Sequence, residues 1–141
     1  MLYRLLRPDE DWQLGVSAKD PNSTKSVFDH VINGSSRGWQ SKYIATCGNL
    51  KSVLTFRSKS VNRQGQIVQI SEDNLPVVII DLRTSSNRSM HYLPGNDSNE
   101  LIDKFNNYAS KFEEVLLVGD VPASHIKPMN ESDFVSVQLP E

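Results

Sequence analysis

The stretch Glu113-Glu114-Val115-Leu116-Leu117-Val118 constrains the fold more than any other part of the sequence. Four consecutive branched apolar residues, closed by Gly119-Asp120, are typical of a β-strand that is buried on both faces. Two carboxylates, Glu113 and Glu114, stand at the start of this strand. Charged residues in that position are either solvated strand ends or members of a site, and the pair alone does not decide between them. The choice depends on what the rest of the chain brings to the same place.

Length and charge limit the classes of protein to which the chain can belong. Its 141 residues predict a single domain, 1–141, that is large enough to bury a core without the support of disulfide bonds or metal ions. The formal net charge of −2 argues against a general nucleic-acid binder, which normally presents a basic face. A local basic groove is still open, because five basic residues are candidates to cluster in space: Arg4, Arg7, Arg57, Lys59 and Arg63.

The cysteine and histidine content bears on metal and nucleophile chemistry. A single Cys47 excludes an internal disulfide framework and a cysteine-rich zinc site. His30 has no second histidine at ligand spacing, so we expect no metal. An acyl-transfer arrangement of Cys47 with His91 or His125 is left open.

The sequence favours a cytoplasmic setting, with secretion as the alternative. No apolar run approaches the ~20 residues of a membrane span, and the first apolar residues are too few for a signal peptide. We therefore expect no membrane association. Five glycosylation sequons point the other way, although a chain rich in Asn and Ser produces them by chance. They begin at Asn22, Asn33, Asn87, Asn96 and Asn130.

Hydrophobic periodicity and turn residues predict an α+β fold with short strands and few helices. Strands are expected over residues 2–7, 40–47, 66–70, 77–82, 115–118, 125–127 and 134–139. Helices are expected over residues 24–33, 50–57 and 98–111, capped by Ser23 or Thr24, by Asn49, and by Asp97 with Glu100. The polar segment 83–99 is expected to be a long loop, and Trp12 and Leu14 are expected to be tucked in.

Three separated pieces of the chain resemble the signature regions of ADP-ribosyltransferases. They are Tyr3-Arg4, Tyr43-Ile44-Ala45-Thr46 and Glu113-Glu114-Val115-Leu116. Their order and spacing, over residues 2–121, are similar to the cholera-toxin-like branch, whose pattern is an arginine, a Ser-Thr-Ser strand end and a Glu-x-Glu pair. The resemblance implies a compact split β-sheet domain of the ADP-ribosyltransferase kind.

The same resemblance implies an enzyme that cleaves the nicotinamide–ribose bond of NAD, its co-substrate. A carboxylate beside the anomeric carbon stabilises the oxocarbenium-like transition state, and that carboxylate is expected to be Glu114. Arg4 is expected to bind a phosphate or ribose oxygen, and Thr46 to orient the glutamate or the ribose. Tyr3, Tyr43 and Phe56 are expected to contact NAD as well. Trp39 and Tyr92 are further aromatic candidates for stacking on nicotinamide.

The chain departs from the family pattern in ways that leave the acceptor open. Ala45 and Cys47 replace the two serines, so only Thr46 matches the middle motif. Phe112 stands where an acceptor-directing Glu or Gln is expected, and Glu113 is predicted to point to the other face of the strand. The alternatives are a protein, nucleic-acid or small-molecule acceptor, NAD hydrolysis, or an inactive domain that binds a nucleotide or a protein partner. The remaining alternative is an unrelated interaction domain in which Arg4 and Glu114 form a salt bridge.

Overall fold

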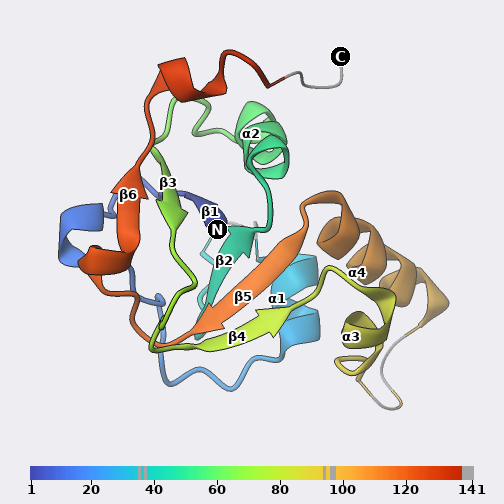
Figure 1. Cartoon of the computed structure of the whole chain (residues 1–141). Helices are drawn as coiled ribbons and strands as arrows, with labels where there is room; N and C mark the ends of the chain where they lie inside the picture. The colour runs from blue at the N-terminus through green and yellow to red at the C-terminus, as the bar shows by residue number, and fades with distance from the viewer. Residues whose placement is uncertain (35, 37, 94, 96–97, 138–141) are drawn as a thin grey trace.

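The computed structural model describes residues 1–34, 36, 38–93, 95 and 98–137. Its centre is one six-stranded antiparallel sheet with the order β4-β5-β2-β1-β3-β6 (Figure 1). The α+β class predicted from the sequence is therefore confirmed. The strands are β1 (Leu2–Leu5), β2 (Tyr43–Cys47), β3 (Ile67–Ile70), β4 (Val78–Asp81), β5 (Glu114–Val118) and β6 (Ile126–Pro128).

The β1–β2 junction divides the sheet into two parts. Strand β2 pairs with β5 through five residue pairs, and β1 pairs with β3 through four. Between β1 and β2 the ladder has a single pair, Tyr3 opposite Cys47. In Figure 1, β3 and β6 accordingly turn away from the β4-β5-β2 part of the sheet.

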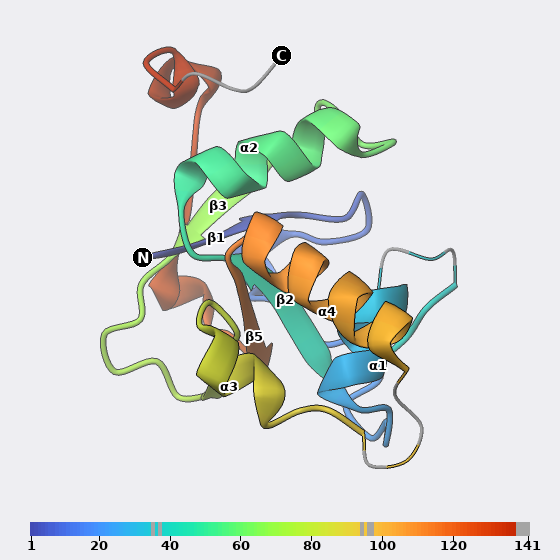
Figure 2. The same ribbon diagram turned by 90° about the vertical axis from the view of Figure 1, so that its right-hand side faces the viewer.

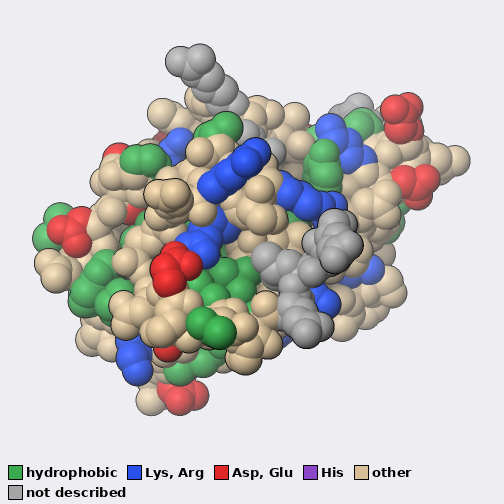
Figure 3. Space-filling model, turned by 90° about the horizontal axis from the view of Figure 1, so that it is seen from above, with side chains coloured by type: hydrophobic (Ala, Val, Ile, Leu, Met, Phe, Trp, Pro, Cys, Tyr) green, Lys and Arg blue, Asp and Glu red, His purple; other side chains and the backbone are tan. Residues whose placement is uncertain are grey.

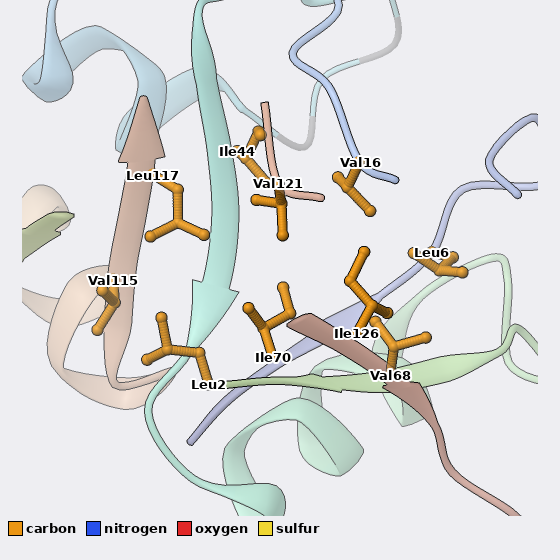
Figure 4. Packing of buried hydrophobic residues seen from close by; sticks show 10 residues of the cluster. All are labelled: Leu2, Leu6, Val16, Ile44, Val68, Ile70, Val115, Leu117, Val121 and Ile126. Atoms are coloured by element: carbon orange, nitrogen blue, oxygen red, sulfur yellow. The ribbon is translucent and has the colours of Figure 1, made fainter. Parts of the chain in front are cut away.

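Strand β5 lies between β4 and β2 and is buried as its sequence predicts. Val115, Leu116 and Leu117 have no solvent exposure. Successive side chains of a strand point to opposite faces, so Val115 and Leu117 enter one apolar cluster and Leu116 enters another. The first cluster fills the space between the two parts of the sheet (Figure 4). Its members are Leu2, Leu6, Val16, Ile44, Val68, Ile70, Val115, Leu117, Val121 and Ile126.

Helices cover the other face of each part of the sheet. Helices α1 (Val27–Asn33) and α4 (Asn99–Lys111) pack on β2, β4 and β5, with Phe28 stacked on Phe105 at 4.9 Å between ring centroids. Helix α2 (Leu50–Lys59) packs on β1 and β3 through Val53 and Leu54. Figure 2 shows α2 on one side of the end of β2, and α1 and α4 on the other.

Side-chain caps set where helices α1, α2 and α4 begin. Ser26, rather than Ser23 or Thr24, caps α1 by accepting a hydrogen bond from the Asp29 backbone N–H. The expected start of this helix was therefore two or three residues too early. Ser98 caps α4 through Leu101 N–H, whereas the expected cap Asp97 lies outside the described residues. Asn49 caps α2 as predicted.

Other segments differ from the sequence predictions. The expected loop after β4 contains a short helix, α3 (Ser85–Ser89), capped by Thr84. The expected strand 134–139 is wrong for its described part, because Phe134 ends a 3₁₀ turn, Glu131–Phe134, and residues 135–137 form no strand; residues 138–139 lie outside the described residues. Leu14 is 85% exposed, so only Trp12 packs against the core.

Two further turns of 3₁₀ helix occur at Trp12–Leu14 and Ala123–His125. An isolated bridge between Val16 and Val121 ties the first of these regions to the chain that follows β5. In the described part of the chain, none of the helices combines the length and apolarity that crossing a membrane requires.

Candidate active site

A cleft of about 580 Å³ opens where the two parts of the sheet meet, and it is lined by residues of α2 on one side and of α1 and α4 on the other. Arg4, Thr46 and Glu114, which are far apart in the sequence, all line it. Tyr3, Tyr43 and Phe56, the other residues expected to contact a nucleotide, line it too. The volume lies within the range of small-molecule sites, roughly 300–1,000 Å³.

Strand pairing explains why the three motifs meet. Tyr3 of β1 lies opposite Cys47 of β2, and Cys47 lies opposite Glu114 of β5. The row Tyr3–Cys47–Glu114 therefore runs across three neighbouring strands at the end where β5 begins. Arg4 and Thr46 are each one residue from this row. The sheet register, and not any single motif, brings the residues together.

Arg4 is held in place by its own partners. Its side chain is only 8% exposed and forms an ion pair with Glu10, Nη2 to Oε1 at 2.9 Å. Its Nη1 donates to the Ala45 carbonyl oxygen at 2.8 Å. Glu10 also accepts a hydrogen bond from the Arg7 backbone N–H. Arg4 Nε and Glu10 Oε2 are buried without a hydrogen-bond partner among the described residues. Thus the ion-pair partner of Arg4 is Glu10 and not Glu114.

Glu114 is the one carboxylate among the described residues that line the cleft, and its acidity is altered. Burial raises its pKa to about 8, and the positive charge of Arg4 opposes that rise. A carboxyl group with this pKa is mostly protonated at neutral pH. Perturbed carboxyls of this kind are common in catalytic sites, although structural ones exist as well.

A tight turn positions Glu114 at the start of β5. Glu113 has φ of +48°, a left-handed conformation that non-glycine residues rarely adopt. Its carbonyl accepts a hydrogen bond from Gly48 N at 2.7 Å. A Cβ at Gly48 would lie 3.3 Å from this carbonyl and under 3 Å from the Arg83 side chain, so a larger residue would require both to shift. Glu113 precedes the strand and is not part of it, which corrects the expected strand geometry of this residue.

Thr46 has a structural bond as well as a place in the cleft. Its Oγ1 donates to the Val115 carbonyl oxygen at 2.6 Å, and the side chain is buried. The hydroxyl proton is thereby used to join β2 to β5. What remains for a ligand is the acceptor capacity of the oxygen.

A neutral histidine faces the same cleft. His30 Nδ1 lies 2.7 Å from Ser41 Oγ, and the Trp39 indole N–H donates to the same nitrogen at 3.4 Å. Burial, with the nearby charge of Arg4, lowers the pKa of His30 to about 4. Because Nδ1 accepts the indole N–H, we assign the imidazole proton to Nε2.

The aromatic candidates separate into two groups. Trp39, Tyr43 and Phe56 line the cleft, and Tyr43 meets the His30 ring edge-on at 5.5 Å. Tyr92 packs against Phe28 and Phe105 under α4 and is not among the residues that line the cleft, so its expected role in stacking was wrong. Phe112, at the end of α4, lines the cleft and meets Phe56 edge-on at 5.4 Å.

The cysteine arrangement considered from the sequence is not brought together. Burial, with the nearby Glu114 carboxylate, raises the pKa of the Cys47 thiol far above its usual value, which disfavours a thiolate nucleophile. Cys47 lines the cleft, but His91 and His125 are not among its lining residues. In the part of the chain that the structure describes, no group of three His, Cys, Asp or Glu residues could hold a metal ion.

The expected basic groove forms only in part. Arg4, Arg7 and Lys59 line the cleft together with Lys19, which the sequence did not suggest. Arg57 instead forms a bidentate ion pair with Glu131. Arg63 is not among the lining residues. The cleft is therefore basic at its rim, as a site for an anionic ligand would be.

Sequence reasoning missed the residues that support the motifs. Glu10 sits in a loop of charged residues, where nothing separates a buried carboxylate from a solvated one. His30 was set aside because it lacks a second histidine for metal binding, and Ser41 carries no pattern at all. The one signal for His30 was its place beside the apolar residues Val27 and Val31 on a helix.

Comparison with known proteins gives one structural likeness. The match with the solved structure EcPltA covers 89% of this chain and 71% of the EcPltA chain, with a TM-score of 0.54 and 16% sequence identity. No family model matches the chain, and a search of curated proteins finds no match. At this level of identity the likeness concerns the α+β fold alone.

Proposed function

We propose that this protein cleaves the nicotinamide–ribose bond of NAD, as an NAD glycohydrolase or an ADP-ribosyltransferase. The observation that carries the proposal is the meeting of Arg4, Thr46 and Glu114 in one cleft of about 580 Å³. Each of the three residues belongs to a sequence motif that resembles those of ADP-ribosyltransferases. The near-division of the sheet between β1 and β2 also agrees with a split-sheet domain of that kind.

The proposed chemistry assigns each residue a task. As nicotinamide leaves, positive charge builds on the ribose, and the Glu114 carboxylate stabilises it. This charge would also lower the pKa of Glu114 from its raised value and so favour its ionised form in the transition state. Thr46, through its oxygen lone pairs, orients the ribose or the carboxylate. Arg4, fixed by Glu10 and the Ala45 carbonyl, keeps a positive charge beside the site.

The surroundings of these residues suit a dinucleotide. The rim cations Arg7, Lys19 and Lys59 favour an anionic ligand, and the pyrophosphate of NAD is one. Trp39, Tyr43 and Phe56 offer aromatic surfaces for the nicotinamide ring. The His30 ring, neutral near pH 7, adds no positive charge against the developing oxocarbenium ion.

The acceptor is water or a group other than a protein arginine. Phe112 occupies the position from which a carboxylate or amide would direct an arginine acceptor, and it packs against Phe56. An apolar wall there offers no hydrogen bond to a guanidinium group. Of the two reactions, NAD hydrolysis needs no acceptor site and is the simpler one for this cleft.

A second candidate is a domain that binds a nucleotide without cleaving it. The observation in its favour is the acidity of Glu114, whose pKa of about 8 leaves little carboxylate at neutral pH. The hydrogen bonds that Arg4 and Thr46 already form within the protein also favour this second candidate, because fewer of their polar atoms are available to a substrate.

The test is nicotinamide release from NAD by purified wild type and by Glu114→Gln, which keeps the shape of the side chain. We expect the substitution to reduce kcat by at least about 100-fold, because the transition-state charge loses its stabiliser. Glu113→Gln, one residue away, is the matched control and should retain activity within a few-fold. Equal NAD consumption by wild type and Glu114→Gln would refute the assignment. Calorimetric binding of NAD without any turnover would favour the second candidate.

A further inference from the structure

A second hollow, of about 510 Å³, adjoins the cleft. Arg7 and Lys19 line both spaces, so the hollow and the cleft meet at these two side chains. The other walls of the hollow come from the chain between β1 and α1 and from Gln40. A ligand that is bound beside Glu114 therefore has room to extend past the shared cations and out of the cleft.

The second hollow carries acidic residues, in contrast to other parts of the surface. Lys and Arg side chains gather in the middle of the face that carries α2 (Figure 3), and the rim of the cleft is basic as well. Asp9, Glu10 and Asp11 line the hollow and not the cleft. The charge thus changes sign along the path, from the shared cations Arg7 and Lys19 to the three carboxylates.

The carboxylates differ in the partners that they already have. Asp9 and Glu10 form ion pairs with arginines. Asp11 forms none among the described residues, and its Oδ1 accepts a hydrogen bond from the Gln13 backbone N–H at 3.0 Å, which leaves Oδ2 available. The Glu10 side chain is only 6% exposed, yet its Oε2 has no hydrogen-bond partner among the described residues. Unsatisfied buried acceptors are rare, and a hydroxyl group in the hollow would supply the missing donor.

The hollow also has an apolar surface. Leu14, which is 85% exposed, and Ala18 both line it. A planar base that packs against these side chains would remove apolar area from water. Carboxylate acceptors beside an apolar surface are complementary to a nucleoside, whose ribose hydroxyls donate hydrogen bonds and whose base has apolar faces. The hollow therefore suits a nucleoside, as the cations at its junction with the cleft suit phosphate.

We propose that the second hollow binds the adenosine half of NAD and that its carboxylates select NAD over NADP. This rests on the proposed function, which puts the nicotinamide ribose beside Glu114. Lys19 contacts the pyrophosphate at the junction, since it is exposed and belongs to no ion pair among the described residues. Asp11 and Glu10 accept hydrogen bonds from the adenosine ribose. NADP carries a phosphate on the 2′-hydroxyl of that ribose, and the carboxylates repel it.

The experiment measures KM for NAD and for NADP from nicotinamide release, and Kd for both by calorimetry in the Glu114→Gln background, where turnover is removed. Asp11→Asn is the informative variant, because asparagine removes the charge and keeps an oxygen that caps the turn. Asp103→Asn is the control, since Asp103 is an exposed aspartate of α4 that lines neither space. Lys19→Gln tests the junction.

The expected results differ between the variants. Wild type should bind NADP at least about tenfold more weakly than NAD, because the 2′-phosphate meets charges of its own sign. Asp11→Asn should reduce this ratio about three- to tenfold, whereas Asp103→Asn should leave it unchanged. Lys19→Gln should weaken the binding of both dinucleotides by a similar factor, about threefold, because both contain the pyrophosphate.

The outcomes separate this inference from the proposed function. Equal affinity of wild type for NAD and NADP overturns the adenosine subsite, and loss of nicotinamide release in Glu114→Gln would still leave the enzyme in place. A ratio that Asp11→Asn does not change overturns the subsite too, as does an equal change in Asp103→Asn. A wild type that prefers NAD through Asp11 but releases no nicotinamide supports the subsite and refutes catalysis. A protein that binds neither dinucleotide overturns both.

Discussion

The apolar cluster between the two parts of the sheet and the cleft at their junction are built from the same strands but differ in how their members are stabilised. In the cluster of Figure 4, all ten side chains are aliphatic and at most 6% exposed. In the cleft, Arg4 and His30 are nearly as buried at 7%, yet both are ionisable. The aliphatic residues are stabilised by leaving water, whereas each polar residue needs a specific partner.

This difference teaches which residues can be exchanged independently. A missing methyl group in the cluster leaves a cavity, whose cost depends on local packing alone. Removing one partner of an ion pair in the cleft leaves the other charge buried and unpaired. The loss of stability then arises at a residue elsewhere in the chain. Strand β5 belongs to both regions, through Leu117 in the cluster and Glu114 in the cleft.

The largest effect on stability is expected from Arg4→Met. It removes the closer ion-pair partner of the Glu10 carboxylate, whose side chain is 6% exposed, leaving only Arg7 at 3.7 Å, and should cost about 4 kcal/mol in the free energy of unfolding. Urea denaturation measures this loss. The double variant Arg4→Met/Glu10→Gln should recover much of it, because no unpaired charge is then buried. A loss below about 1 kcal/mol would mean that the pair behaves as a solvated surface pair.

A somewhat smaller loss is expected from Leu117→Ala in the apolar cluster. Removing a fully buried leucine should cost about 3 kcal/mol through lost burial and the cavity left behind. Leu117 is not among the residues that line the cleft, so the NAD affinity of the folded fraction should stay within about twofold. A tenfold change in KM would show that cluster and cleft are energetically coupled.

A dependence of stability on pH is expected as well, and Glu114→Gln should remove it. The pKa of Glu114 rises from 4.5 to about 8 on folding, so the folded state binds the extra proton between these values. Stability contributed by the protonated group is present below pH 4.5 and is lost as pH rises through 8. The melting temperature of wild type should therefore fall by roughly 10–20 °C relative to Glu114→Gln over this interval, as measured by thermal denaturation.

The same titration should govern catalysis in the opposite sense. If the reaction needs the Glu114 carboxylate, nicotinamide release should increase as pH rises through about 8, over the upper part of the range in which stability falls. A rate that is constant from pH 6 to pH 9 would contradict the role of Glu114 as the ionised stabiliser.

Residues with strong local patterns were predicted well from the sequence. The apolar run from Val115, the alternation in 66–70 and the cap at Asn49 all led to the correct elements. The errors occurred where the pattern was weak or the environment decided. The segment from Phe134 to Val137 has the composition of a strand. In the structure, Phe134 ends a 3₁₀ turn, and Phe134 and Val137 pack against the apolar cluster that contains Val53 of α2. The strand at 78–81 lies at the sheet edge, where Val78 is 61% exposed despite its apolar sequence.

The sequence by itself determined the α+β class, the buried strand β5 and the three places in the chain where Arg4, Thr46 and Glu114 stand. These follow from periodicity and from motif order, which are local properties. Only the tertiary structure decided that Glu10 holds Arg4, that the Thr46 hydroxyl is used by β5, and that His30 faces the cleft. Each of these depends on a sheet register or a loop path that joins distant residues, and it is this joining that changes the burial, partners and acidity of a side chain.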